Sequence, residues 1–146
     1  MRTIVSQVYV KKDNKILMVQ ENKESKKGKW NMPAGKLEDN ESIIDAAIRD
    51  IKEETNINIK ITGLIAIQQN ITSIGQLIIL YFKGEYLSGE IKYDEKEIAD
   101  VKWMTIEEIQ KLDKSIIRGG ETIDDIITLA EKEPIPLDRI IIENML

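Results

Sequence analysis

The sequence contains no histidine and no cysteine. The absence of histidine excludes Ser-His-Asp and Cys-His catalysis, imidazole metal ligands and a histidine proton shuttle. The absence of cysteine excludes disulfides, thiolate nucleophiles, iron–sulfur clusters and thiolate haem ligands. Catalysis is left to carboxylates, lysine, tyrosine, serine and threonine, and the 26 acidic residues make an oxygen-ligated metal ion the natural partner.

Other features that are scarce in the sequence limit the class of protein that it can encode. Aromatic residues make up only 5% of the chain, so the core must be built from isoleucine and other aliphatic residues, which favours sheet. The longest apolar run, residues 77–82, is far shorter than the ~20 residues of a membrane helix. Residues 1–14 carry no signal-peptide cleavage site, and a net charge of -5 argues against a polyanion-binding surface. We expect one soluble, cytoplasmic domain spanning residues 1–146.

Strands and helices are expected to alternate along the chain. Strands are predicted where β-branched and other apolar residues gather, over residues 3–10, 16–20, 57–71, 76–83 and 101–104. The first two form a hairpin, and residues 57–71 and 76–83 are predicted to be central strands. Helices are predicted over residues 41–55, 105–112 and 122–131, from apolar spacing and, for the second, from the capping-box pair Thr105 and Glu108. Residues 30–35 read as a compact turn-forming loop. This mixture predicts an α/β sandwich, on which the apolar residues 137–146 either dock or form a dimer contact.

One side of the predicted helix over residues 41–55 is acidic. Asp50, Glu53 and Glu54 stand at spacings of three and four residues and are rotated away from the apolar stripe. Like charges at this spacing repel each other, so the arrangement favours a bound cation such as Mg2+. The alternative is a solvated surface helix.

The segment around this helix resembles the Nudix box. Gly35 and Glu41 are separated by five residues, Glu41 and Arg49 by seven, and a glutamate pair follows, as in that family. Asp50 stands where the family has Glu, and Asn56 stands where it has Gly. The shorter Asp changes the metal geometry or admits a water, whereas Asn readily adopts the left-handed conformation of a helix cap. The resemblance implies an α/β/α sandwich with a mixed sheet and the loop-helix-loop of the box.

The resemblance also implies roles for the acidic residues. A divalent metal, Mg2+ or Mn2+, would be held by the Gly35 carbonyl and by the carboxylates of Asp50, Glu53, Glu54 and Glu97. The catalytic set would be Arg49, Glu53, Glu54 and Glu97, with one carboxylate as the general base.

Arg49 would act as a salt-bridged strut that orients the carboxylates, with Glu41 in support. Simpler alternatives remain: Gly35 as a turn glycine, Arg49 as a surface partner of Glu53 or Asp45, and Glu97 as a solvated loop acid.

Five further residues are candidates for substrate binding. Lys36 could meet phosphate oxygens, as could Lys27 or Lys29. Trp30 and Tyr81 could stack on a heterocycle, although aromatic residues more commonly pack in a core.

The resemblance implies hydrolysis of a phosphoanhydride bond in a small nucleotide or diphosphate by a monomer or homodimer. Residues 30–38, with Pro33-Ala34-Gly35 in place of the commoner Pro-Gly-Gly, resemble the bacterial NudJ-type phosphatases, as do Pro136, Leu137 and Ile140. That subgroup releases phosphate from nucleoside tri- and diphosphates and from hydroxymethylpyrimidine diphosphate. The alternatives are other Nudix substrates (8-oxo-dGTP, ADP-ribose or dinucleoside polyphosphates) and a Nudix module that binds a ligand without hydrolysing it.

Overall fold

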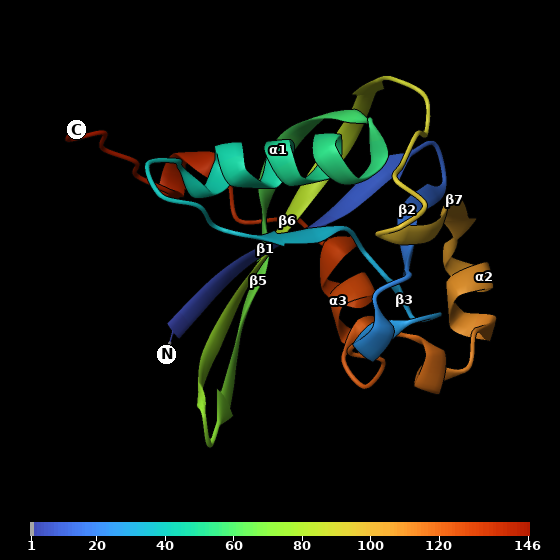
Figure 1. Cartoon of the computed structure of the whole chain (residues 1–146). Helices are drawn as coiled ribbons and strands as arrows, with labels where there is room; N and C mark the ends of the chain where they lie inside the picture. Colours follow the sequence, from blue (N-terminus) through green and yellow to red (C-terminus); the bar gives the residue numbers. More distant parts are fainter. Residues whose placement is uncertain (1) are drawn as a thin grey trace.

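The computed structural model describes residues 2–146 and shows a mixed seven-stranded sheet with helices on both faces (Figure 1). The strands are β1 (Arg2–Lys12), β2 (Lys15–Glu21), β3 (Trp30–Asn31), β4 (Ala34–Lys36), β5 (Asn58–Thr72), β6 (Gly75–Ser88) and β7 (Ile98–Thr105). The α-helices are α1 (Ile43–Thr55), α2 (Ile106–Lys111) and α3 (Ile123–Ala130). Short 3-10 turns are η1 (Glu24–Lys26), η2 (Lys114–Ile116) and η3 (Leu137–Arg139).

The long strand β1 organises the sheet. It runs parallel to β6 from Arg2 to Lys11 and antiparallel to both β2 and β4. The main strand order is β3-β2-β1-β6-β5, with β4 joined to β1 and β7 joined to β2. The prediction that residues 57–71 form a central strand is therefore wrong: β5 is an edge strand. Its apolar residues Ile67 and Ile71 are 63% and 73% exposed.

Each face of the sheet has its own core, which confirms the α/β/α sandwich. Successive side chains of a strand point to opposite faces, so Val8 and Val10 pack on the side of α1 while Tyr9 packs on the side of α2 and α3. Ile51 of α1 is fully buried in the first core, and Ile126 of α3 is buried in the second. Figure 1 shows α1 and α3 on opposite sides of the sheet.

Local signals place the helix boundaries. The helix predicted from residue 41 begins at Ile43, because the Ser42 hydroxyl accepts a hydrogen bond from the Asp45 backbone N–H (3.0 Å) and acts as the N-cap. The predicted capping box at α2 is confirmed, with Thr105 and Glu108 bonded reciprocally. The stretch predicted as a loop at residues 30–35 instead contains β3 and most of β4, since long-range pairing with β2 and β1 draws it into the sheet.

The end of the chain docks on the sheet only in part. The backbones of Leu64 and Ile135 exchange two hydrogen bonds of 2.8 Å, and Leu137 and Ile140 pack against the α1-side core. Beyond them the side chains are exposed, Met145 to 86%. Within residues 2–146, no helix combines the length and the apolar character needed to cross a membrane.

Candidate active site

The acidic side of α1 is divided by depth. Asp50 is only 6% exposed, Glu54 is partly buried and Glu53 is exposed. The three carboxylates therefore share a side of the helix, as their spacing predicts, but they do not share one solvated surface. Asp50 lies beneath β4, whereas Glu53 and Glu54 line a cavity at the end of the helix.

Gly35 is needed because Asp50 occupies the space beside it. Gly35 lies within β4, opposite Ser6 of β1, and its φ is not left-handed. A Cβ at this position would lie 2.1 Å from Cγ of Asp50. The interpretation of Gly35 as a turn glycine is therefore wrong. Close packing of a strand on a carboxylate explains the glycine, and this packing brings the Gly35 backbone to the acidic side of α1.

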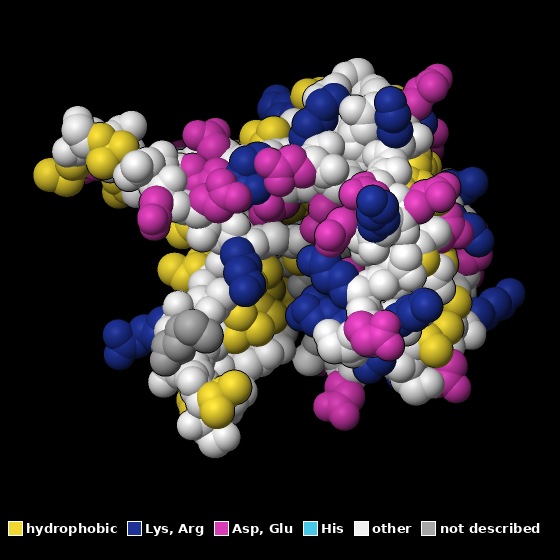
Figure 2. Space-filling view, viewed as in Figure 1, with side chains coloured by type: hydrophobic (Ala, Val, Ile, Leu, Met, Phe, Trp, Pro, Cys, Tyr) yellow, Lys and Arg dark blue, Asp and Glu magenta, His cyan; other side chains and the backbone are white. Residues whose placement is uncertain are grey.

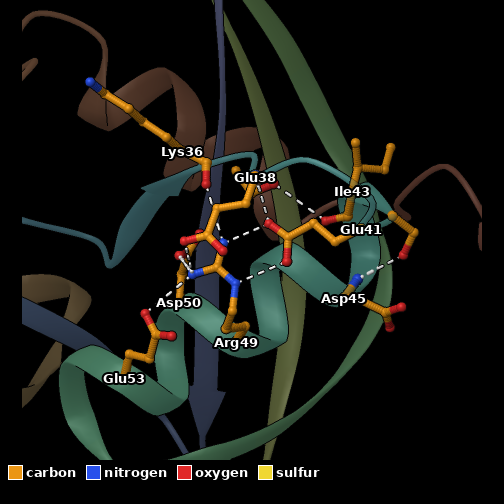
Figure 3. Close-up of polar contacts among 10 residues, drawn as sticks. Lys36, Glu38, Glu41, Ile43, Asp45, Arg49, Asp50 and Glu53 are labelled. Atoms are coloured by element: carbon orange, nitrogen blue, oxygen red, sulfur yellow. Dashed lines mark hydrogen bonds and ion pairs between the residues drawn. The ribbon is translucent and has the colours of Figure 1, made fainter.

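Arg49 is the hub of the polar contacts around α1 (Figure 3). Its Nε and Nη2 donate to the two carboxylate oxygens of Glu41, at 2.9 and 2.6 Å. Its Nη1 donates to Asp50 (2.8 Å) and to Glu53 (3.2 Å). Nη2 also donates to the Lys36 carbonyl at 3.3 Å, while the Lys36 ammonium group points away from it.

The arginine thus ties the loop before α1 to two carboxylates on α1 itself. This geometry fits the predicted strut, with Glu41 as its support. Because Arg49 presents a rigid fork of donors, it can hold several oxygens in fixed directions, which a lysine cannot do.

The Asn56 departure from the box is accommodated as predicted. Asn56 has φ 67°, in the left-handed region, and its N–H donates to the Lys52 carbonyl at 2.9 Å. Its side-chain amide donates to the Glu90 carbonyl at 3.0 Å. Asparagine therefore ends α1 in the manner of a glycine cap and also ties the helix end to the loop after β6.

A cavity of about 580 Å³ brings together most of the predicted metal-site residues. Its lining includes Gly35, Glu53, Glu54 and Glu97, which come from β4, from α1 and from the loop before β7. Glu97 is exposed, and its Oε2 lies 3.4 Å from Nζ of Lys23. Asp50 is absent from the lining, because its side chain is turned toward Gly35 and Arg49.

Sequence reasoning missed several residues of this cavity. These are Glu21, Asp94, Lys23, Lys26 and Arg118. Of the three lysines considered for phosphate contacts, Lys36 lines the cavity, whereas Lys27 and Lys29 do not. The missed residues come from segments far apart in the chain, and their local sequence carries no signal beyond their charge.

Burial and mutual repulsion disfavour the ionised carboxylates. Burial, followed by the charges of Glu21, Asp50 and Glu53, raises the pKa of Glu54 to about 8. Burial raises the pKa of Asp50 to about 6 despite the opposing charge of Arg49. By contrast, hydrogen bonds from Arg49 and the Glu38 backbone lower the pKa of Glu41 to about 2.

These residues fit a divalent cation. The donors are carboxylate and backbone oxygens, which suit Mg2+, and a cation would relieve the repulsion that raises the pKa of Glu54. One buried oxygen, Oδ2 of Asp50, has no hydrogen-bond partner within residues 2–146. Across the same residues, no three acidic side chains are already gathered as a ready metal cluster.

A second cavity, of about 430 Å³, adjoins the first. The two share lining residues, among them Lys26, Lys36 and Arg118. Figure 2 shows Lys and Arg side chains gathered beside a hollow, below an acidic band that follows α1. Cationic groups therefore stand between the carboxylates of one cavity and the interior of the other.

The second cavity has a mixed polar and apolar lining, which includes no acidic side chain within residues 2–146. Four amide residues line it, Gln7, Asn31, Gln68 and Asn70. Apolar side chains such as Met32, Leu77 and Ile79 complete the wall. Gln7 and Asn31 are buried and hydrogen-bonded to each other. In the sequence, the signal for such a pocket is a glutamine within an otherwise apolar strand.

The two aromatic candidates have different positions. Tyr81 lines the second cavity, is 5% exposed and donates its hydroxyl hydrogen bond to Oε1 of Gln68 (2.7 Å). Trp30 is 6% exposed, packs in the core and lines neither cavity. The structure therefore does not place Trp30 as a stacking surface, because β3 buries its ring. Its carbonyl instead accepts a hydrogen bond from the Arg118 N–H (2.8 Å), which anchors that cationic residue.

Comparison with known proteins gives consistent matches. The family model described as NUDIX domain matches residues 1–125. A NUDIX hydrolase from Nitrosomonas europaea superposes with a TM-score of 0.87 and 25% identity, covering 100% of both chains.

Among curated proteins, "Putative nudix hydrolase 1" of Caenorhabditis elegans is 30% identical over 84% of this chain and 34% of its own length. "NAD-capped RNA hydrolase NudC" of Vibrio parahaemolyticus is 30% identical over 83% of this chain and 47% of its own length. The chain thus spans between a third and a half of the length of these curated relatives.

Proposed function

The chain belongs to the NUDIX domain family, and we propose that it is a metal-dependent hydrolase of phosphoanhydride bonds in small nucleotide-type substrates. One observation carries the proposal. A single cavity joins Glu53, Glu54, Glu97 and the Gly35 backbone, and it shares three cationic side chains with an adjoining pocket whose other lining residues are uncharged. This is an arrangement for a diphosphate at one end and an organic group at the other.

The carboxylates supply the metal end in this proposal. Glu53 and Glu54 would be the main ligands, with the Gly35 carbonyl and Glu97 as further candidates. Asp50, which does not line the cavity, would act through a water. A divalent metal, Mg2+ or Mn2+, supplies charge neutralisation and an activated water when bound. Arg49 holds Glu53 in place from behind, through its bidentate pair with Glu41.

The remaining charged groups would act on the phosphates and the proton. Lys26, Lys36 and Arg118 line both cavities, so their charges can meet phosphate oxygens that lie between them. Glu97 lines the cavity and would act either as a metal ligand or as the general base that accepts the proton of an attacking water.

The lining of the second cavity limits which organic group of a substrate could bind there. Its amides offer both donors and acceptors, whereas a cationic group would meet the three shared cations. A neutral heterocycle such as a purine or pyrimidine suits this wall. The Pro33-Ala34-Gly35 resemblance supports release of phosphate from nucleoside tri- or diphosphates or from hydroxymethylpyrimidine diphosphate. We further propose that residues 1–146 act as one cytoplasmic domain, as a monomer or homodimer.

Product analysis tests the proposal. Phosphate and pyrophosphate release would be measured with Mg2+ for GTP, GDP, hydroxymethylpyrimidine diphosphate, 8-oxo-dGTP, ADP-ribose, diadenosine tetraphosphate and NAD. The wild type would be compared with Glu54→Gln and with Glu107→Gln, a matched change of an exposed glutamate on α2 outside both cavities. We expect phosphate from the first three substrates, a loss of about a hundredfold or more in Glu54→Gln, and no change in Glu107→Gln.

The other outcomes separate the alternatives. Pyrophosphate release from triphosphates, or hydrolysis of ADP-ribose alone, would retain the hydrolase and reject the phosphatase assignment. Absence of turnover of all seven compounds, together with tight binding of one of them to both wild type and Glu54→Gln, would instead show a ligand-binding module.

A further inference from the structure

Glu21 lies outside the box, at the end of β2, yet it lines the same cavity as Glu53 and Glu54. We propose that Glu21 is a further ligand of the divalent metal and supplies the carboxylate that Asp50, by turning away, does not bring to the cavity. This inference rests on the metal site of the proposed function, and it adds a residue that the box does not contain.

The backbone aims Glu21 at the cavity. The pairing of β2 with β7 shifts register between Gln20 and Glu21, so that Gln20 lies opposite Asp100 and Glu21 opposite Ile98. Such an irregularity redirects the side chain at the end of a strand. The Glu21 backbone is fixed on both sides, since its N–H donates to the Lys29 carbonyl (2.9 Å) and its carbonyl accepts from the Gly28 N–H (2.8 Å).

The carboxylate of Glu21 is poorly paired for its depth. Its side chain is 17% exposed, and within residues 2–146 it makes one ion pair, with Arg118, at 4.0 Å from Nη1 to Oε1. A pair at that distance is weak. Lys23 and Lys26 line the same cavity, but among residues 2–146 neither forms an ion pair with Glu21, so its carboxylate is weakly paired and would favour a bound cation.

Glu21 and Glu54 line the same cavity from two different elements. Glu21 lies at the end of β2, and Glu54 lies in the last turn of α1. Both side chains are partly buried. Asp50, in contrast, contacts Gly35 and pairs with Arg49.

The box has Asp at position 50 in place of Glu, and the structure provides another carboxylate for the cavity. The Asp50 carboxylate lies between β4 and Arg49 and does not reach the cavity, whereas Glu21 lines it from the end of β2. Together with Glu54 it offers two hard oxygen donors from two rigid elements, which is what a divalent cation needs.

Metal binding without substrate tests the inference. Free Mn2+ would be measured by electron paramagnetic resonance during titration of the wild type, Glu21→Gln, Glu54→Gln and Arg118→Gln. Glu24→Gln is the matched control, because Glu24 is an exposed glutamate close in sequence that does not line the cavity. We expect Glu21→Gln to weaken Mn2+ binding by about tenfold or more, the loss that even an outer partner of a ligand causes. Glu24→Gln should stay within about twofold of the wild type. Arg118→Gln should not weaken Mn2+ binding, because it removes a positive charge from the cavity.

Urea unfolding of the metal-free proteins shows whether each variant folds. Glu21→Gln should be at least as stable as the wild type, since it removes repulsion of Glu54. If Glu54→Gln weakens Mn2+ binding and Glu21→Gln does not, the role of Glu21 is wrong while the proposed metal site stands. If neither weakens binding, the metal site itself is wrong. If Arg118→Gln and Glu21→Gln weaken binding equally, Glu21 acts by holding Arg118 and the inference fails.

Discussion

Gly35 and Asp50 pack directly against each other. A Cβ on Gly35 would lie 2.1 Å from Cγ of Asp50, so the strand and the helix can approach this closely only because residue 35 has no side chain. The same contact explains why Asp50 is buried although it lies on the acidic side of α1. The glycine of the box therefore serves packing, and packing in turn sets the position of the neighbouring carboxylates.

Gly35→Ala should destabilise the protein by about 1–3 kcal/mol, the range typical of overpacking, because β4 or α1 must move. Urea unfolding measures this change. The matched test is a double-mutant cycle with Asp50→Ala, which removes the clashing carboxylate. We expect the cost of Gly35→Ala to fall sharply in the Asp50→Ala background, and strictly additive effects would contradict the proposed contact.

Arg49→Lys should abolish most activity even though the charge is kept. A lysine cannot donate at once to Glu41, Asp50 and Glu53, so at least one of these carboxylates loses its partner. We expect a loss of about 1–3 kcal/mol in stability, because charged groups are left unpaired. The measurements are urea unfolding and turnover with Mg2+. Lys52→Ala, at an exposed position of the same helix, is the control and should change neither. Wild-type turnover in Arg49→Lys would show that charge alone suffices.

The metal-free protein should lose stability as the pH rises above neutrality. A carboxyl group whose pKa is higher in the folded than in the unfolded chain binds its proton more tightly when folded. Its contribution is full below about pH 4, the unfolded pKa, and is lost as the pH rises through the folded pKa. For Asp50 and Glu54 these folded pKa values are about 6 and about 8.

The urea midpoint, measured from about pH 5 to about pH 9, checks this slope. Glu54→Gln carries no titrating proton at residue 54 and should flatten the upper part of the curve. Added Mg2+ should flatten the wild-type curve as well, since a bound cation favours the ionised carboxylates. A midpoint that rises over this pH range would contradict the repulsion described here.

Asn56→Ala should destabilise the protein by about 1 kcal/mol, because alanine is strained in the left-handed conformation that Asn56 adopts. Asn56→Gly should cost less, since glycine adopts this conformation freely but loses the hydrogen bond to the Glu90 carbonyl. Thermal unfolding of the three proteins gives the ranking. Equal stability of the alanine and glycine variants would show that the backbone conformation at residue 56 is not limiting.

Short-range patterns were sufficient for much of the fold. The apolar spacing along α1, the capping box at Thr105 and the left-handed cap at Asn56 each involve residues within a turn or two, and all three appear in the structure. The edge position of β5 and the strands in residues 30–36 were not predictable in this way. Both depend on which distant strands pair, and several pairings satisfy the same local pattern.

By itself, the sequence determined the chemistry available to this protein: with neither histidine nor cysteine, and with an acidic helix in a Nudix box, the site had to be built from oxygen donors. Only the tertiary structure decided how deeply each group is buried and which other groups it contacts. It buried Asp50 against Gly35 and withdrew Trp30 into the core. It also brought Glu21 and Arg118 to the cavity from segments on either side of the box. The physical reason is that charge and side-chain type are local properties, whereas burial, repulsion and metal-binding geometry arise only when distant segments pack together.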